Sequence, residues 1–184
     1  IKFKVFAGCT SLASVVIPTS VYHIEHGAFL DCSSLASVEI HAWVLSIGCS
    51  AFRRCTSLAS VDFIGGDEFI KEVLTWGWKA NLRWIGSHAF RDCIALETIA
   101  IPPSVYSIGH CAFQDCTGLY SLTLPTSIRE LTDWRPNPDI NLGWRAFHGC
   151  HSNIQREVNE ARAERQAQLR SAIGRLVLAA QRHF

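Results

Sequence analysis

One short pattern occurs six times along the chain and constrains the fold more than any other feature. In each copy a phenylalanine, preceded by alanine in all but the first, is followed three residues later by cysteine. The segments AFLDCSSLASVEI at 28–40 and AFRRCTSLASVDF at 51–63 are nearly identical and lie 23 residues apart. Two longer intervals mark insertions between copies. A fixed period of this length predicts a solenoid, in which each copy forms one turn of a stack. The phenylalanines are Phe6, Phe29, Phe52, Phe90, Phe113 and Phe147.

Each copy contains one predicted strand. In the first copy Val15 and Ile17 alternate with residues that point outward, and Pro18 then removes the backbone N–H that a strand ladder needs. The following segment, residues 20–29, predicts a tight turn or a short irregular arm. A glycine recurs shortly before the Ala-Phe pair, as at Gly48 and Gly86, where we expect a permissive backbone conformation. A single turn buries too little apolar surface to fold alone, so stability must come from stacking.

Six of the eight cysteines occupy the same place in the repeat. Side chains at equivalent places on stacked turns are parallel, whereas the two cysteines of a disulfide must point toward each other. The sequence therefore predicts a row of buried, reduced thiols, which behave as small hydrophobic side chains.

The pattern L-x-x-V/I-x-I/L-P, followed by V-x-x-I-G-x-x-A-F-x-x-C, covers residues 1–150 and resembles the BspA-type, or Treponema pallidum-type, leucine-rich repeat. The resemblance implies a leucine-rich-repeat solenoid, a curved stack of turns with a parallel β-sheet on its concave side. It also implies a noncatalytic function, the binding of a protein partner, at the cell surface or in secreted form. The reduced thiols favour an intracellular compartment instead.

The outward residues of the predicted strands form a candidate recognition strip. The strip is small and mostly neutral, but it carries an acidic residue on each of two adjacent turns, Glu39 and Asp62, which favours a cationic partner. The alternative is an ordinary solvated sheet face. The candidate binding residues are Ser37, Glu39, His41, Ser60, Asp62, Thr98, Ser121 and Thr123.

The two insertions, near residues 64–81 and 132–142, are the second candidate contact. The first contains Trp76 and Trp78 and is followed by Trp84, and the second contains Trp134 and is followed by Trp144. Tryptophan is favoured at the energetic centres of protein interfaces. Insertions in solenoids also tend to form loops on one face, often the binding face. These side chains could instead cover the protein's own core. The candidates are Trp76, Trp78, Trp84, Trp134, Arg135 and Trp144.

Residues 151–184 lack the repeat and predict a C-terminal amphipathic helix. Ser152 and Gln155 have the spacing of a capping box, and Leu169, Ile173 and Leu176 follow at helical spacing. The helix could cap the open end of the solenoid or dock onto a partner. A third possibility, contact with a membrane surface, is weakly supported because the segment carries six Arg against three Glu.

Composition and motifs exclude several classes of protein. A net charge of +1 gives no field that would recruit nucleic acid. There is no transmembrane run or signal peptide, and the absence of Met predicts an excerpt or a processed product. His26 and Cys49 could be neighbours on successive turns, but two ligands do not make a zinc site, so we expect no metal, cofactor or catalytic residue.

The sequence therefore predicts a noncatalytic protein–protein interaction module that uses its concave sheet and its tryptophan-containing insertions. The alternative is a structural or scaffold subunit of a larger assembly, held by the insertions and the C-terminal helix. The partner in either case is a protein whose identity the repeat does not specify.

Overall fold

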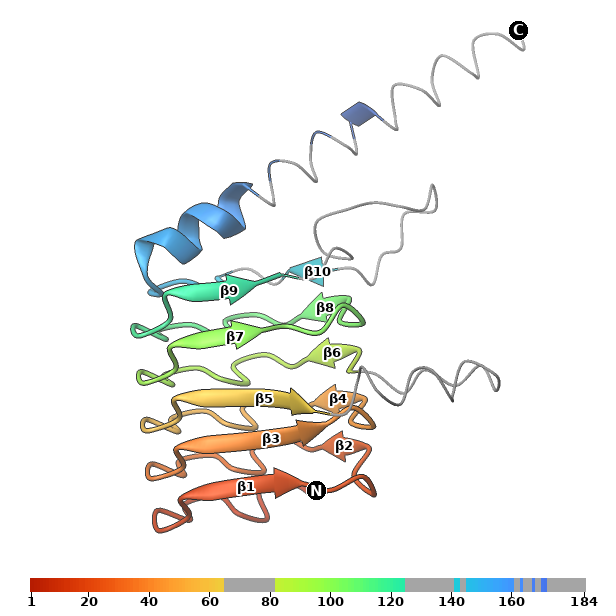
Figure 1. Cartoon of the computed structure of the whole chain (residues 1–184), viewed down its shortest axis with the longest axis vertical. Coiled ribbons are helices and arrows are strands. Elements are labelled where there is room, and N and C mark those ends of the chain that lie inside the picture. The colour runs from red at the N-terminus through yellow and green to blue at the C-terminus, as the bar shows by residue number, and fades with distance from the viewer. Residues whose placement is uncertain are drawn as a thin grey trace, which may run out of the picture.

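The computed structural model describes residues 1–64, 82–124, 141–142, 145–160, 163, 167, 170 and 171. These residues stack as successive turns, with longer strands on one side and two-residue strands on another (Figure 1). A helix over residues 152–160 follows the last turn. The longer strands are β1 (Ser14–Ile17), β3 (Ser37–His41), β5 (Ser60–Ile64), β7 (Thr98–Ala100) and β9 (Ser121–Thr123). The short strands are β2 (His23–Ile24), β4 (Ser46–Ile47), β6 (Trp84–Ile85), β8 (Ser107–Ile108) and β10 (Asn141–Leu142).

All strand pairs are parallel, as expected when equivalent segments of successive turns lie side by side. The longer strands form the sheets β1-β3-β5 and β7-β9, which confirms the strand predicted in each copy. The short strands form a second, five-stranded sheet in the order β10-β8-β6-β4-β2. The sequence predicted only a turn or an irregular arm there. A two-residue strand such as His23–Ile24 is too short to give a periodic signal, so this sheet depends on contacts between turns.

The repeated phenylalanines form a continuous stack through the core. Phe29, Phe52, Phe90 and Phe113 are completely buried. Ring centroids of neighbours are 5.0–5.2 Å apart and their planes are within 12° of parallel. The stack crosses both insertions, from Phe52 to Phe90 and from Phe113 to Phe147. The turns on either side of each insertion are therefore in direct contact at the core.

The predicted row of buried thiols is confirmed. Cys32, Cys55, Cys93, Cys116 and Cys150 are buried and reduced, whereas Cys9 on the first turn is exposed. Each buried thiol donates a hydrogen bond to the phenylalanine carbonyl of the preceding turn, with Sγ–O distances of 3.0–3.2 Å. Burial raises the pKa of the Cys55 thiol to about 12 and that of Cys93 well above its ordinary value. These thiols are therefore neutral donors at neutral pH.

The tight turn around each phenylalanine uses left-handed backbone conformations at two places. The residue two before the ring and the residue two after it both have positive φ angles, such as 55° at Ser50 and 60° at Arg54. The recurrent glycine has a different purpose from the one predicted. A Cβ atom at Gly86 would lie 2.6 Å from the backbone nitrogen of Cys49, so close approach between turns, and not a special φ angle, excludes a side chain there.

The N-cap of the helix lies one residue before the predicted cap residue, Ser152. His151 is the N-cap residue, because its carbonyl accepts from the Gln155 N–H at 3.3 Å and its Nδ1 accepts from the Asn153 N–H at 3.4 Å. The predicted Ser152–Gln155 capping box is therefore wrong, and the Gln155 side chain donates to the Cys150 carbonyl instead. Ile154 and Val158 lie one turn apart and are buried in the core cluster.

Candidate protein-interaction face

The outward side chains of β3, β5, β7 and β9 form one surface, which we call the long-strand face. Parallel register sorts these side chains into columns across the strands. Ser37 pairs with Ser60, Glu39 with Asp62, and His41 with Ile64. Thr98 pairs with Ser121, and Ala100 with Thr123. The face therefore has a hydroxyl column, an acidic column on β3 and β5, and a third column that begins at His41.

Glu39 and Asp62 are the charged groups of this face. Both are exposed, and the register places them directly beside each other on adjacent strands. Like charges in that arrangement repel, and a cation bound between them would relieve the repulsion. The geometry therefore favours a positively charged group in front of β3 and β5.

A hollow of about 550 Å³ lies beside the acidic pair, where β5 meets β7. Neighbouring long strands form ladders elsewhere, but β5 and β7 belong to separate sheets. The Glu97 N–H donates to the Ala59 carbonyl at 3.4 Å and joins the two turns where these strands begin. Ala100 adds only a methyl group to the acidic column. The lining residues are Glu39, Ser60, Val61, Asp62, Phe63, Ile64, Thr98, Ile99 and Ala100.

A second hollow of about 370 Å³ lies at the carboxyl ends of the same strands and shares Phe63, Ile64 and Ala100 with the first. Its lining is mainly apolar and includes Ile101, Pro102 and Pro103. His41 also lines it, and the Nδ1 atom of His41 is buried without a hydrogen-bond partner. Sequence reasoning missed both hollows. Neither the insertion after β5 nor the small side chain at Ala100 indicates a hollow by itself.

The structure places most of the predicted site residues on the long-strand face. Thr98, Ser121 and Thr123 are exposed there, and Ser37, Ser60 and His41 are partly exposed. Trp84 is exposed but lies on β6, in the second sheet, so it does not join Glu39 and Asp62 on this face. The other predicted contacts lie outside the described residues, and their role in binding stays a prediction: Trp76, Trp78, Trp134, Arg135 and Trp144.

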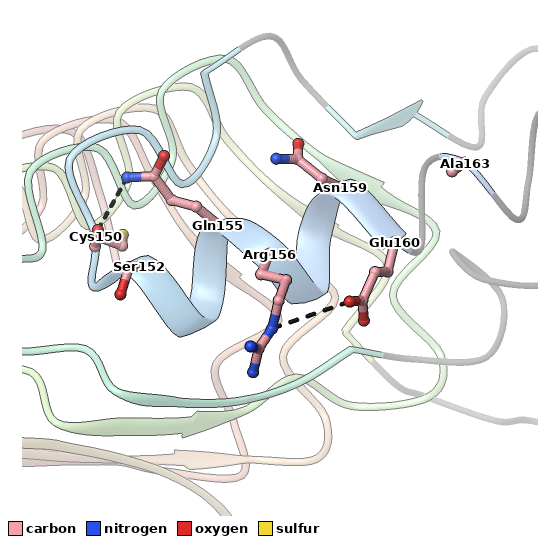
Figure 2. A pocket seen from close by; sticks show the side chains of 7 residues that line it. All are labelled: Cys150, Ser152, Gln155, Arg156, Asn159, Glu160 and Ala163. Carbon is pink, nitrogen blue, oxygen red and sulfur yellow. Dashed lines mark hydrogen bonds and ion pairs between the residues drawn. The ribbon is translucent and has the colours of Figure 1, made fainter.

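Another hollow, of about 750 Å³, lies along the C-terminal helix and is drawn in Figure 2. Gln155 points toward the Cys150 carbonyl, while Arg156 and Glu160 point toward each other with Nε and Oε1 3.9 Å apart. The lining is polar, and the two opposite charges pair within it. This hollow therefore offers neither an apolar anchor site nor a net charge to a partner.

Two features are absent from the residues that the structure describes. No three His, Cys, Asp or Glu side chains gather there as ligands for a metal ion. No helix within that part of the chain is long and apolar enough to cross a membrane.

Comparison with known proteins gives one family. The model of the BspA type leucine-rich repeat region matches residues 1–74 and 77–135 in six copies. A leucine-rich repeat protein from Bacteroides ovatus is 31% identical with a TM-score of 0.57, over 69% of this chain and 29% of that protein. A leucine-rich cell surface protein from Faecalibacterium prausnitzii is 30% identical with a TM-score of 0.52, over 62% of this chain and 26% of that protein.

The chain thus spans less than a third of the length of either protein. No curated protein matches it. The family model covers most of the chain, and the matched residues include the stacked phenylalanines from Phe6 to Phe113 and the buried thiols from Cys32 to Cys116. The chain belongs to the BspA-type leucine-rich repeat family.

Proposed function

We propose that the chain is a noncatalytic protein-interaction module that binds a protein partner through the long-strand face. The observation that carries this proposal is the exposed, in-register pair of Glu39 and Asp62. Two adjacent carboxylates with a hollow beside them are a poor arrangement for stability and a good one for recognising a cation. The repeat family supports a role in protein interaction, because its regular stack presents an extended, preformed surface.

Affinity capture from a lysate of the source cells tests the proposal. Wild-type protein is compared with a Glu39→Lys/Asp62→Lys variant, and captured proteins are identified by mass spectrometry. The control is Glu157→Lys/Glu160→Lys, which makes the same change in charge on the C-terminal helix. We expect a partner that wild type and control both retain and that the face variant loses. A partner retained equally by all three proteins would place the contact elsewhere.

A further inference from the structure

The two hollows and the acidic pair form one continuous surface along β3 and β5. Glu39 and His41 are two residues apart on β3, so their side chains emerge on the same side, about 7 Å apart along the strand. Asp62 and Ile64 repeat this spacing on β5. The acidic hollow and the apolar hollow meet at Phe63, Ile64 and Ala100. A ligand on the acidic column is therefore one strand period away from the apolar hollow.

The acidic part of this surface selects for charge. Glu39 and Asp62 line the first hollow, and its lining contains no Lys or Arg among the described residues. A Lys or Arg side chain placed between the two carboxylates could pair with both of them, because no basic residue of that lining competes for them. Charge complementarity of this kind steers and orients a partner more than it adds affinity.

The apolar part selects for a large side chain that also carries a polar group. Its volume and lining suit an aromatic ring. His41 lines this hollow and is partly exposed, so an imidazole nitrogen can accept a hydrogen bond from the donor on such a ring. Trp and Tyr have this combination of an apolar body and one N–H or O–H donor. Phe would fill the hollow equally but would leave the nitrogen unpaired.

We propose, resting on the proposed function, that the long-strand face binds an extended segment of the partner in which a Lys or Arg and a Trp or Tyr are separated by one residue. In an extended chain, residues two apart point the same way and lie about 7 Å apart, which matches the spacing of Glu39 and His41. The basic side chain enters the acidic column and the aromatic side chain enters the apolar hollow. Adjacent basic and aromatic residues would point to opposite sides and could not use both sites.

Fluorescence anisotropy with labelled peptides tests the spacing. The probe is a serine peptide in which Lys and Trp are separated by one Ser. The two comparison peptides have Lys and Trp adjacent, or Glu in place of Lys. We expect the probe to bind at least about tenfold more tightly than either comparison peptide, a difference of about 1.4 kcal/mol. Equal binding of all three peptides would overturn the proposal.

Variants of the full chain test the two sites separately. We expect Glu39→Gln/Asp62→Asn to weaken binding of the Lys-Ser-Trp probe at least about tenfold and to remove most of the salt dependence of that binding. We expect His41→Leu to reduce the preference for the Lys-Ser-Trp probe over a Lys-Ser-Phe peptide. The same variant should keep the preference for Lys over Glu at the first of these positions. Glu157→Gln/Glu160→Gln is the matched control and should bind as wild type does. A control that loses binding equally would overturn the assignment.

Two other outcomes separate this proposal from alternatives. If only a Trp76→Ala/Trp78→Ala variant binds the probe, the chain's own insertion is the occupant and the proposal of a partner segment is wrong. If no variant binds it but lysate capture still depends on Glu39 and Asp62, the face binds a partner of different chemistry. The inference then fails while the proposed function stands. Capture that does not depend on those carboxylates would remove both.

Discussion

Phe52 and Phe90 stack with ring centroids 5.2 Å apart, although residues 65–81 lie between them in the sequence. The neighbouring backbone follows the same path, because the Phe52 N–H donates to the Ala89 carbonyl at 2.7 Å and the Cys93 thiol donates to the Phe52 carbonyl at 3.1 Å. The two turns are therefore joined at the core as tightly as turns without an insertion. Among the described residues the two turns differ from the others on the long-strand face, where β5 and β7 do not form a ladder.

Removal of one phenylalanine ring from the stack should lower the free energy of unfolding substantially. Phe90 is completely buried between Phe52 and Phe113, so Phe90→Ala leaves a cavity that neighbouring turns cannot close without losing their spacing. We expect a loss of about 3–5 kcal/mol in the free energy of unfolding, measured by urea denaturation. Tyr120→Ala is the control. Because Tyr120 is 54% exposed, its substitution should change the free energy of unfolding by no more than about 0.5 kcal/mol. Equal costs would mean that the stack is not continuous.

Gly86→Ala should destabilise the protein more than Gly8→Ala. At Gly86 the new methyl group would lie 2.6 Å from the Cys49 nitrogen and 2.7 Å from the Gly48 carbonyl carbon, so the backbones of two turns must separate. Overpacking of this kind costs about 1–3 kcal/mol or more. Gly8 has a φ angle of 74° but open space around it, so its variant carries only the strain of a left-handed alanine, about 1–2 kcal/mol. Thermal unfolding of both variants ranks them, and the reverse order would contradict the steric explanation.

The repeat itself could be read completely from the sequence, because Ala, Phe and Cys recur at fixed places and each has one environment on every turn after the first. The columns of the long-strand face could also be predicted, since alternation places Glu39 and Asp62 outward whatever the length of the strand. The second sheet could not, because its strands of two residues carry no periodic signal. The two hollows could not be predicted either. Both hollows lie where the insertion after β5, the small side chain of Ala100 and the missing ladder between β5 and β7 coincide. Only the relative position of the two turns in the structure shows that these three features meet.

The places where sequence reasoning was wrong have a common physical cause. The sequence predicts backbone freedom at Gly48 and Gly86, but their role is set by the backbone of the preceding turn. The spacing from Ser152 to Gln155 predicts a cap at Ser152, but His151 occupies that position because the chain turns directly from Cys150 into the helix. In each case a contact with a neighbouring turn or segment decides the outcome.

The buried thiols should make the protein lose stability at alkaline pH. Desolvation by burial raises the pKa of Cys55 from 9.0 to about 12. From pH 9 to about 12 the folded chain therefore retains a proton that the unfolded chain releases, and the free energy of unfolding falls as pH rises. The slope for one thiol is at most about 1.4 kcal/mol per pH unit. Below pH 9 the contribution of this thiol is fully present.

Urea denaturation at several pH values checks this expectation. We expect Cys55→Ala to show a shallower loss of stability between pH 9 and 12 than wild type. Cys9→Ala, which changes the exposed cysteine, should follow the wild-type curve. Other groups titrate in the same range, so the difference between the two variants is the relevant quantity. Identical slopes in all three proteins would show that the Cys55 pKa is not raised.

Arg54→Gly should be more stable than Arg54→Ala. Arg54 has a φ angle of 60° and forms ion pairs with Asp31 at 3.5 Å and Asp92 at 3.9 Å. Both substitutions remove these exposed pairs, which are worth about 0–1 kcal/mol. Only alanine keeps the strain of a left-handed Cβ, so we expect the glycine variant to be more stable by about 1 kcal/mol in thermal unfolding. At ordinary helical positions alanine is the more stable of the two, and that order here would contradict the argument.

Ile154→Ala should loosen the C-terminal end of the stack before the rest. Ile154 is 1% exposed and packs with Val158 against the core, so its truncation should cost about 2–5 kcal/mol. Each turn contacts mainly its neighbours, and the loss should therefore concentrate in the last turns. Hydrogen exchange measured residue by residue should show faster exchange in β9 than in β3. Asn159→Ala, on the exposed side of the helix, is the control. Uniformly faster exchange in all strands would mean that the stack unfolds as one unit and that the helix does not act locally.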